Sequence, residues 1–164
     1  MAKVTSDSHM RSSETFRIRL NSLIADLDCS IYEFADKANV SKGVLTRAAL
    51  YGIIPSVRPL IKIANCLCVS LEYLLGLTDN TFYEPAPSPS TFHIRLAELC
   101  GERNVKYSEI GALMPFSANL FYDWQREKTI PSLEYLLALA EYFKVSPDYL
   151  LGRTDDDTPQ THEK

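Results

Sequence analysis

The segment TFRIRL at residues 15–20 returns as TFHIRL at residues 91–96, an offset of 91 − 15 = 76 residues. The same offset relates YLLGLTD at residues 73–79 to YLLGRTD at residues 149–155. No gap is needed between the two pairs, and about a third of the aligned positions are identical. Two copies that each carry their own apolar pattern predict two duplicated globular domains, because a solenoid needs at least three stacked repeats.

The two copies differ in charge. The chain has 164 residues and a formal net charge of −4. Residues 15–79 hold seven basic and six acidic side chains, a balance of 7 − 6 = +1. Residues 91–155 hold seven and nine, a balance of 7 − 9 = −2. A phosphate-rich ligand is therefore expected to meet the first copy rather than the second.

The sequence carries no sign of export, membrane insertion or catalysis. Its start is polar and it has no long uncharged apolar run, so we expect the cytoplasm and no membrane contact. It has no nucleophile–base pattern, glycine-rich phosphate loop or metal-ligand cluster, so we expect neither an enzyme nor a cofactor. The cysteines do not recur at matched positions, which favours reduced structural thiols at Cys29, Cys66, Cys68 and Cys100.

Apolar residues in each copy recur at helical spacing, so both domains are expected to be all-α. Phe16 and Leu20 lie on one face of the first expected helix. Ser30 and Glu33 form the pattern of a capping box at the start of the second helix, and Ser41 is placed to cap the third. Five helices are expected in the first copy, at about residues 16–27, 30–38, 41–51, 56–67 and 70–76, with five at the matching positions of the second.

These patterns divide the chain into five parts. Residues 1–13 are polar and lack periodicity, so we expect disorder there, and part of the segment resembles a cloning scar. The two domains are expected at residues 14–79 and 91–155. Residues 80–90 contain alternating prolines, which predict an extended, semi-rigid spacer. Residues 156–164 are expected to form a solvated tail.

The order of these elements resembles the phage Cro/repressor-like helix-turn-helix family of DNA-binding domains, and the resemblance covers both copies nearly end to end. The matching features include the turn at residues 40–41, the Pro-Ser pair at 55–56 and the Val-Ser pair at 69–70. The resemblance implies two tandem five-helix, lambda-repressor-like helix-turn-helix domains joined by the proline-rich linker. It also implies that the third helix of each domain enters the major groove of DNA.

Carried over residue by residue, the resemblance assigns the DNA contacts to the outward positions of the third helix. In the first domain these positions are Ser41, Lys42, Gly43, Thr46 and Arg47. Lysine and arginine can address guanine, threonine can hydrogen-bond to a base or touch a thymine methyl group, and glycine allows close approach. The first domain is therefore expected to be the main reader.

The matching positions of the second domain suit DNA less well. Its candidate contacts are Ser117, Asn119, Tyr122 and Arg126. Asp123 stands at the position of Arg47, and an aspartate there opposes a phosphate-rich ligand. The family also usually has a glutamine at the start of the second helix to hold a phosphate, and here that position is Ile31 or Tyr107.

Two apolar features near the third helices have a structural interpretation. Leu50, Tyr51, Ile53 and Ile54 are expected to pack in local core or between domains rather than to form a partner site. Trp124 is expected in the core rather than stacked on a base.

Two functions remain open. The first is a sequence-specific transcriptional regulator that binds double-stranded DNA as a pseudo-dimer. Eleven extended linker residues at about 3.1 Å each span about 34 Å, close to the half-site spacing of about 34–36 Å. The second is a degenerate helix-turn-helix adaptor that binds a protein, through domain 2 or by self-association, without contacting DNA. The acidic balance and Asp123 motivate the adaptor, whereas Lys42 and Arg47 lead us to prefer the regulator.

Overall fold

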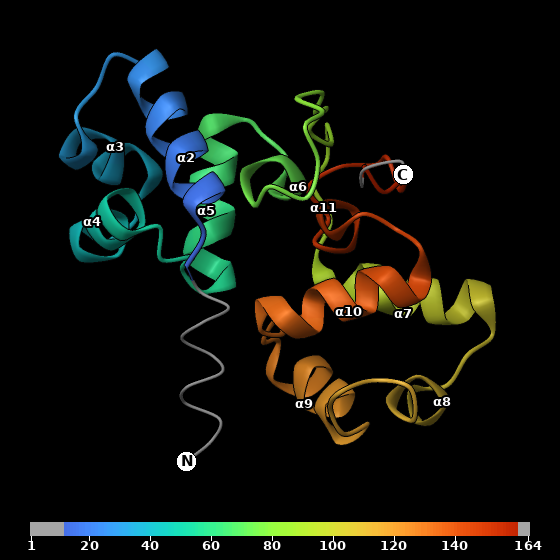
Figure 1. The fold of residues 1–164 in the computed structure, drawn as a ribbon. Helices are drawn as coiled ribbons and strands as arrows, with labels where there is room; N and C mark the ends of the chain where they lie inside the picture. Colours follow the sequence, from blue (N-terminus) through green and yellow to red (C-terminus); the bar gives the residue numbers. More distant parts are fainter. Residues whose placement is uncertain (1–11, 161–164) are drawn as a thin grey trace. The chain divides into compact units, whose positions relative to one another are not determined.

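The protein is all-helical in the computed structural model, which describes residues 12–160 (Figure 1). That range contains ten helices and no strand, apart from one isolated antiparallel bridge between Ser12 and Ile53. The all-α prediction is therefore confirmed. The expectations for residues 1–11 and 161–164 fall outside the described residues. No helix in the described part of the chain has both the length and the apolar character needed to cross a bilayer.

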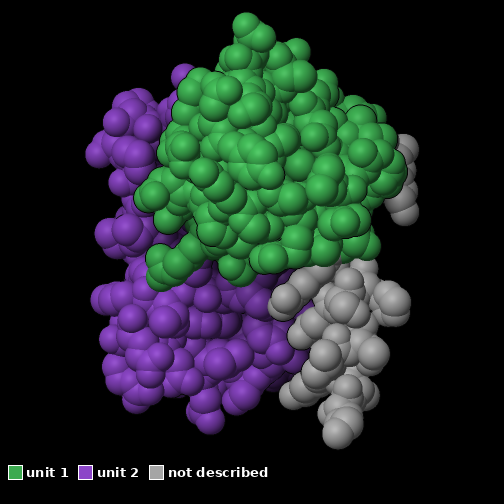
Figure 2. Space-filling view, turned by 90° about the vertical axis from the view of Figure 1, so that its left-hand side faces the viewer, with its two compact units in different colours: residues 1–82, 161–164 green, residues 83–160 purple. Residues whose placement is uncertain are grey.

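The chain divides into two units, drawn in separate colours in Figure 2. Among the described residues, unit 1 comprises residues 12–82 and unit 2 comprises residues 83–160. The helices of unit 1 are α2 (Glu14–Asp26), α3 (Ile31–Ala38), α4 (Lys42–Tyr51), α5 (Val57–Leu67) and α6 (Leu71–Leu74). The helices of unit 2 are α7 (Phe92–Arg103), α8 (Tyr107–Gly111), α9 (Asn119–Glu127), α10 (Leu133–Phe143) and α11 (Pro147–Leu150).

The core of unit 1 is built from the apolar helix faces that the sequence spacing predicts. Phe16 and Leu20 of α2 are fully buried, and so are Leu45 and Ala48 of α4 and Leu60 of α5. Helices α2 and α3 both pack against α4. Because only one side of α4 is covered in this way, its other side faces solvent.

Unit 2 has an aromatic core around α9. The rings of Trp124 and Phe121 meet edge-on with their centroids 5.4 Å apart. Phe116 and Phe92 also meet the Trp124 ring edge-on, at 5.2 Å and 5.8 Å. Edge-to-face pairs of this kind stabilise a core beyond the area that they bury. Trp124 is only 5% exposed, so the prediction that it belongs to the core is confirmed.

An arginine from the first helix of each unit binds the last helix and the segment that follows it. In unit 1, Arg19 donates hydrogen bonds to the carbonyl oxygen of Tyr73 and, at 2.7 Å, to the carboxylate of Asp79. Its guanidinium also lies over the Tyr73 ring. In unit 2, the guanidinium of Arg95 lies over the Tyr149 ring and donates a hydrogen bond to the carboxylate of Asp155. These contacts give a structural reason for the repetition of TFRIRL and YLLGLTD.

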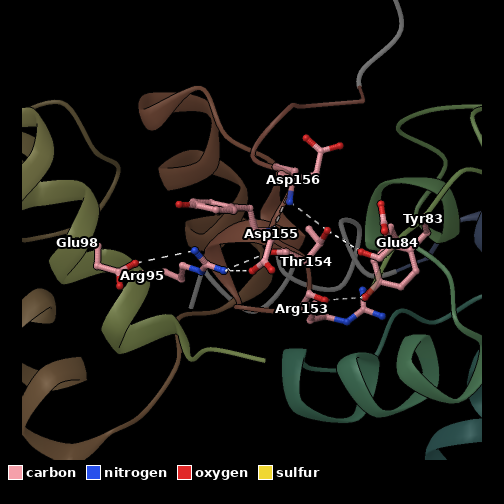
Figure 3. A network of polar contacts seen from close by, with 10 residues as sticks. Tyr83, Glu84, Arg95, Glu98, Arg153, Thr154, Asp155 and Asp156 are labelled. Carbon is pink, nitrogen blue, oxygen red and sulfur yellow. Dashed lines mark hydrogen bonds and ion pairs between the residues drawn. The ribbon is translucent and has the colours of Figure 1, made fainter. Parts of the chain in front are cut away.

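The predicted spacer at residues 80–90 is not free over its whole length. Residues 83–90 belong to unit 2 and fold onto its C-terminal segment (Figure 3). The backbone N–H of Ala86 donates to the carbonyl oxygen of Arg153 at 2.9 Å, and that of Ser90 donates to Gly152 at 3.0 Å. Residues 83–90 are therefore held on unit 2 by tertiary hydrogen bonds, which the predicted spacer did not include.

The units also extend beyond the predicted domain ends. The Ser13 hydroxyl oxygen caps α2 by accepting from the N–H of Phe16 at 3.1 Å, and the Ser13 N–H donates to the carbonyl oxygen of Gly52 at 2.9 Å. At the other end, the N–H of Ser146 donates to the carbonyl oxygen of Asp157 at 2.9 Å. Residues 12–13 are therefore hydrogen-bonded to the rest of unit 1. Asp156 and Asp157 are exposed, so the first residues of the tail join unit 2 through backbone hydrogen bonds while their side chains face the solvent.

Candidate nucleic-acid interface

A tight turn between α3 and α4 positions the candidate reading helix. Asn39 ends α3 in the left-handed conformation with φ of 56°, which asparagine adopts more readily than most residues. Ser41 then caps α4, because its hydroxyl oxygen accepts from the N–H of Val44 at 3.2 Å. The ammonium group of Lys62 in α5 donates to the carbonyl oxygen of Asn39 at 3.3 Å. The start of α4 is thus fixed by its own cap and by a contact from the next helix.

The five predicted contacts of unit 1 lie together at the start and on the outward side of α4. Ser41, Lys42, Gly43 and Arg47 are exposed, and Thr46 is half-buried. Residues four apart lie on one helix face, so Lys42 lies beside Thr46 and Gly43 beside Arg47. The opposite side of α4 is the one buried in the core.

Lys42 and Arg47 are the two cations of this face. The Nη1 atom of Arg47 lies 3.6 Å from the position that a Cβ atom on Gly43 would take, so the guanidinium runs along the glycine. Within residues 12–160, neither Lys42 nor Arg47 forms an ion pair with a carboxylate. Two exposed cations without such a partner attract an anionic ligand.

Sequence reasoning missed Tyr32, which lies beside Lys42. The Lys42 ammonium is 5.7 Å from the centroid of the Tyr32 ring, within the range of a cation–π contact. Tyr32 is in the first turn of α3 and is 59% exposed. The position of Tyr32 just after the cap Ser30 was the available signal in the sequence. The apolar spacing within α3 does not show that its first turn meets Lys42 of α4.

The four predicted contacts of unit 2 are exposed. They are Ser117, Asn119, Tyr122 and Arg126. Helix α9 begins at Asn119, and the Ser117 hydroxyl oxygen accepts from the Asn119 N–H at 3.3 Å. Tyr122 and Arg126 are four residues apart, so they share one face of the helix.

Arg126 differs from Arg47 in having acidic partners. Its Nη2 atom lies 2.9 Å from an oxygen of Asp123 and 3.4 Å from an oxygen of Glu127. The pairs are largely exposed, so each contributes little to stability. They nevertheless offset the one basic charge among the predicted contacts of this face. The charge asymmetry expected from the sequence therefore recurs in the local pairing.

Tyr107, at the start of α8, is half-buried and packs against other aromatic residues of unit 2. Its ring stacks on Phe121 with centroids 4.8 Å apart and planes 9° from parallel, and Tyr122 meets it edge-on at 5.4 Å. Burial raises the pKa of the Tyr107 hydroxyl, the neighbouring Cys100 raises it further, and a hydrogen bond with Gln125 opposes the shift. The hydroxyl is thus already engaged within the unit, which does not favour a role as a phosphate anchor.

The apolar residues at the end of α4 and just after it behave in two ways. Ile54 is buried, and Ile53 is half-buried and paired with Ser12. Leu50 and Tyr51 are 60% and 68% exposed. The expectation of packing is therefore confirmed for Ile53 and Ile54 and not for Leu50 and Tyr51, which lie at the solvent.

No protein-family model, curated protein or solved structure matches this chain. The chemistry of the exposed sides of α4 and α9 is therefore what indicates a function. Over residues 12–160 no group of three or more His, Cys, Asp or Glu side chains is arranged to hold a metal ion. The α4 face combines two cations, hydroxyl groups and a glycine, a set suited to a polyanion with base edges to read. The α9 face is aromatic and locally acidic.

Proposed function

We propose that the protein is a sequence-specific transcriptional regulator that binds double-stranded DNA, with unit 1 as its main reader. The observation that carries the proposal is the pair Lys42 and Arg47, both exposed on the outward side of α4 and without a carboxylate partner among the described residues. The proposal also rests on the resemblance of both copies to the phage Cro/repressor-like helix-turn-helix family.

In this proposal α4 enters the major groove with its N-terminal end towards the bases. Lys42 and Arg47 contact guanine or phosphate, and Thr46 contacts a base edge or a thymine methyl group. Gly43 leaves room for the approach, since it has no side chain and only the Arg47 guanidinium lies near the position of its absent Cβ. Ser41 is both the helix cap and a further hydroxyl at the groove.

Unit 2 contributes less in this proposal. Ser117, Asn119 and Tyr122 are accessible for contacts, but the charge of Arg126 is offset by Asp123 and Glu127. The linker no longer supports simultaneous reading of half-sites about 34 Å apart, because residues 83–90 are folded onto unit 2. The pseudo-dimer arrangement is therefore proposed only from the duplication itself.

A protein-binding adaptor is the second candidate. The observation that favours it is exposed apolar surface on both units. Leu50 and Tyr51 are the last two residues of α4. Leu113 precedes α9 and Tyr122 lies in its first turn, and they are 71% and 59% exposed. Exposed aromatic and aliphatic residues are typical of protein contacts. In this alternative the protein regulates a partner without touching DNA.

A titration of the whole chain against random and genomic duplex DNA at two salt concentrations tests the proposal. We expect binding that weakens with salt, and a loss of several kcal/mol in the variant Lys42→Ala with Arg47→Ala. The matched control is Arg103→Gln with Lys144→Asn, which removes two exposed cations of unit 2 and suits the left-handed backbone of residue 144. Absence of duplex binding at low salt would replace the regulator with the adaptor.

A further inference from the structure

The two copies differ at one position of the segment that ends each domain. Unit 1 has Leu77 between glycine and threonine, and unit 2 has Arg153. Leu77 is 37% exposed, whereas Arg153 is buried and forms an ion pair with Asp148, which is also buried. A buried arginine that the duplicated position does not require indicates a task specific to unit 2.

Arg153 contacts the segment that connects the units (Figure 3). Its guanidinium lies 4.8 Å from the centroid of the Tyr83 ring. Its carbonyl oxygen accepts a hydrogen bond from the Tyr83 hydroxyl at 3.1 Å and another from the Ala86 N–H at 2.9 Å. Both the side chain and the backbone of one residue therefore hold the connecting segment.

The neighbours of Arg153 hold the same segment. The Thr154 hydroxyl donates to the carbonyl oxygen of Glu84 at 2.8 Å. The Ser90 N–H donates to the carbonyl oxygen of Gly152 at 3.0 Å. Ala86 is 7% exposed. Contacts thus occur at both ends of residues 83–90 and in between.

We propose that residues 83–90 form a strap, closed onto unit 2 by Tyr83 and Arg153, that sets how much chain is free between the units. With the strap closed, the connection is residues 80–82, at most about 9 Å at about 3.1 Å per residue. With the strap open it is residues 80–90, about 34 Å on the same basis. The closed strap restricts the independent motion of the two units, and this holds whether or not the protein binds DNA.

Amide hydrogen exchange and ¹⁵N relaxation of the full chain test the strap. In Tyr83→Ala we expect exchange at the Ala86 and Ser90 amides to be at least tenfold faster, and the rotational correlation time of each unit to fall. The control Phe82→Ala changes the adjacent aromatic residue, which is 58% exposed, and should leave both measurements unchanged. Unchanged exchange at Ala86 in Tyr83→Ala, or an equal change in the control, would overturn the proposal.

Fluorescence of the buried Trp124 shows whether unit 2 is still folded in Tyr83→Ala. If it is not, a milder variant tests the strap. Tyr83→Phe keeps the ring over Arg153 and removes only the hydroxyl that donates to its carbonyl oxygen. Faster exchange at Ala86 in folded Tyr83→Phe supports the strap. No change in that variant overturns it.

Discussion

The guanidinium carbon of Arg19 lies 4.2 Å from the centroid of the Tyr73 ring. The same arginine donates hydrogen bonds at 2.7 Å to the carbonyl oxygen of Thr78 and to the carboxylate of Asp79. These contacts join the first helix of unit 1 to its last helix and to the segment after that helix. The most strongly repeated sequences of the chain therefore close each unit. The residues proposed to read DNA lie elsewhere, on α4, where the two copies have diverged.

Replacing Arg19 with lysine tests this closing contact. Arg19→Lys should destabilise unit 1 by about 1–3 kcal/mol, because lysine keeps the charge but cannot stack on Tyr73 and reach two oxygens with a planar fork. A urea titration followed by amide NMR signals of unit 1 measures the change. Arg17→Lys is the matched control, since Arg17 pairs with Glu14 at the surface and its replacement should have little effect. Equal shifts in both variants would contradict the interpretation.

Features of the fold that depend on residues close in sequence could be predicted. The 3.6-residue spacing of Phe16 and Leu20 places both in the core. Ser41 is a side-chain cap as its position before an apolar-periodic segment predicts. The exposed set on α4 follows from the same periodicity, because burying one face of a helix leaves the opposite face at the solvent.

Features that depend on residues distant in sequence could not be predicted. Alternating prolines indicate the local backbone preference of residues 80–90, but not the hydrogen bonds from Ala86 to Arg153 that fold part of that segment. The contact between Lys42 and Tyr32 likewise needs the packing of α4 against α3. Leu50 and Tyr51 were expected to pack but are exposed, because apolar character alone does not ensure burial.

Tyr32 should contribute to DNA binding by positioning Lys42. Tyr32→Leu is expected to weaken specific affinity by about two- to fivefold, because an exposed cation–π contact contributes about 0.5–1 kcal/mol. Tyr32→Phe keeps the aromatic face and should bind like the original chain. The loss of DNA affinity caused by Tyr32→Leu is measured once in the original chain and once in the Lys42→Ala variant. If Tyr32→Leu costs the same affinity when Lys42 is absent, the two residues do not act together.

Cys100 should be the slow thiol of the chain. Burial raises the pKa of its thiol from the ordinary 9.0 to about 11, so little reactive thiolate forms at pH 8. Alkylation at pH 8, followed by mass spectrometry, should therefore modify exposed Cys68 at least tenfold faster than Cys100. In urea the rates should converge. Because the folded chain resists ionisation of this thiol, the free energy of unfolding is unaffected by Cys100 below pH 9 and falls as the pH rises from 9 towards 11. Equal rates in the folded chain would disprove the assignment.

Asp123→Arg should convert the α9 face into a better DNA contact. The change places a cation at the position that matches Arg47 and removes the carboxylate that lies 2.9 Å from Arg126. If both arginines then meet phosphates, non-specific affinity should rise and the slope of log affinity against log salt should steepen by about one to two. Titrations of duplex DNA at several salt concentrations measure that slope.

The control for this prediction is Glu141→Arg, which makes the same change of charge at an exposed position of α10 in the same unit. A general electrostatic effect would raise the affinity of both variants alike, whereas a contact made by α9 steepens the salt slope of Asp123→Arg alone. Equal slopes in the two variants would therefore remove α9 from the interface and leave unit 1 as the sole proposed reader. A steeper slope for Asp123→Arg alone would indicate that unit 2 still presents α9 to the duplex and that Asp123 limits its contribution.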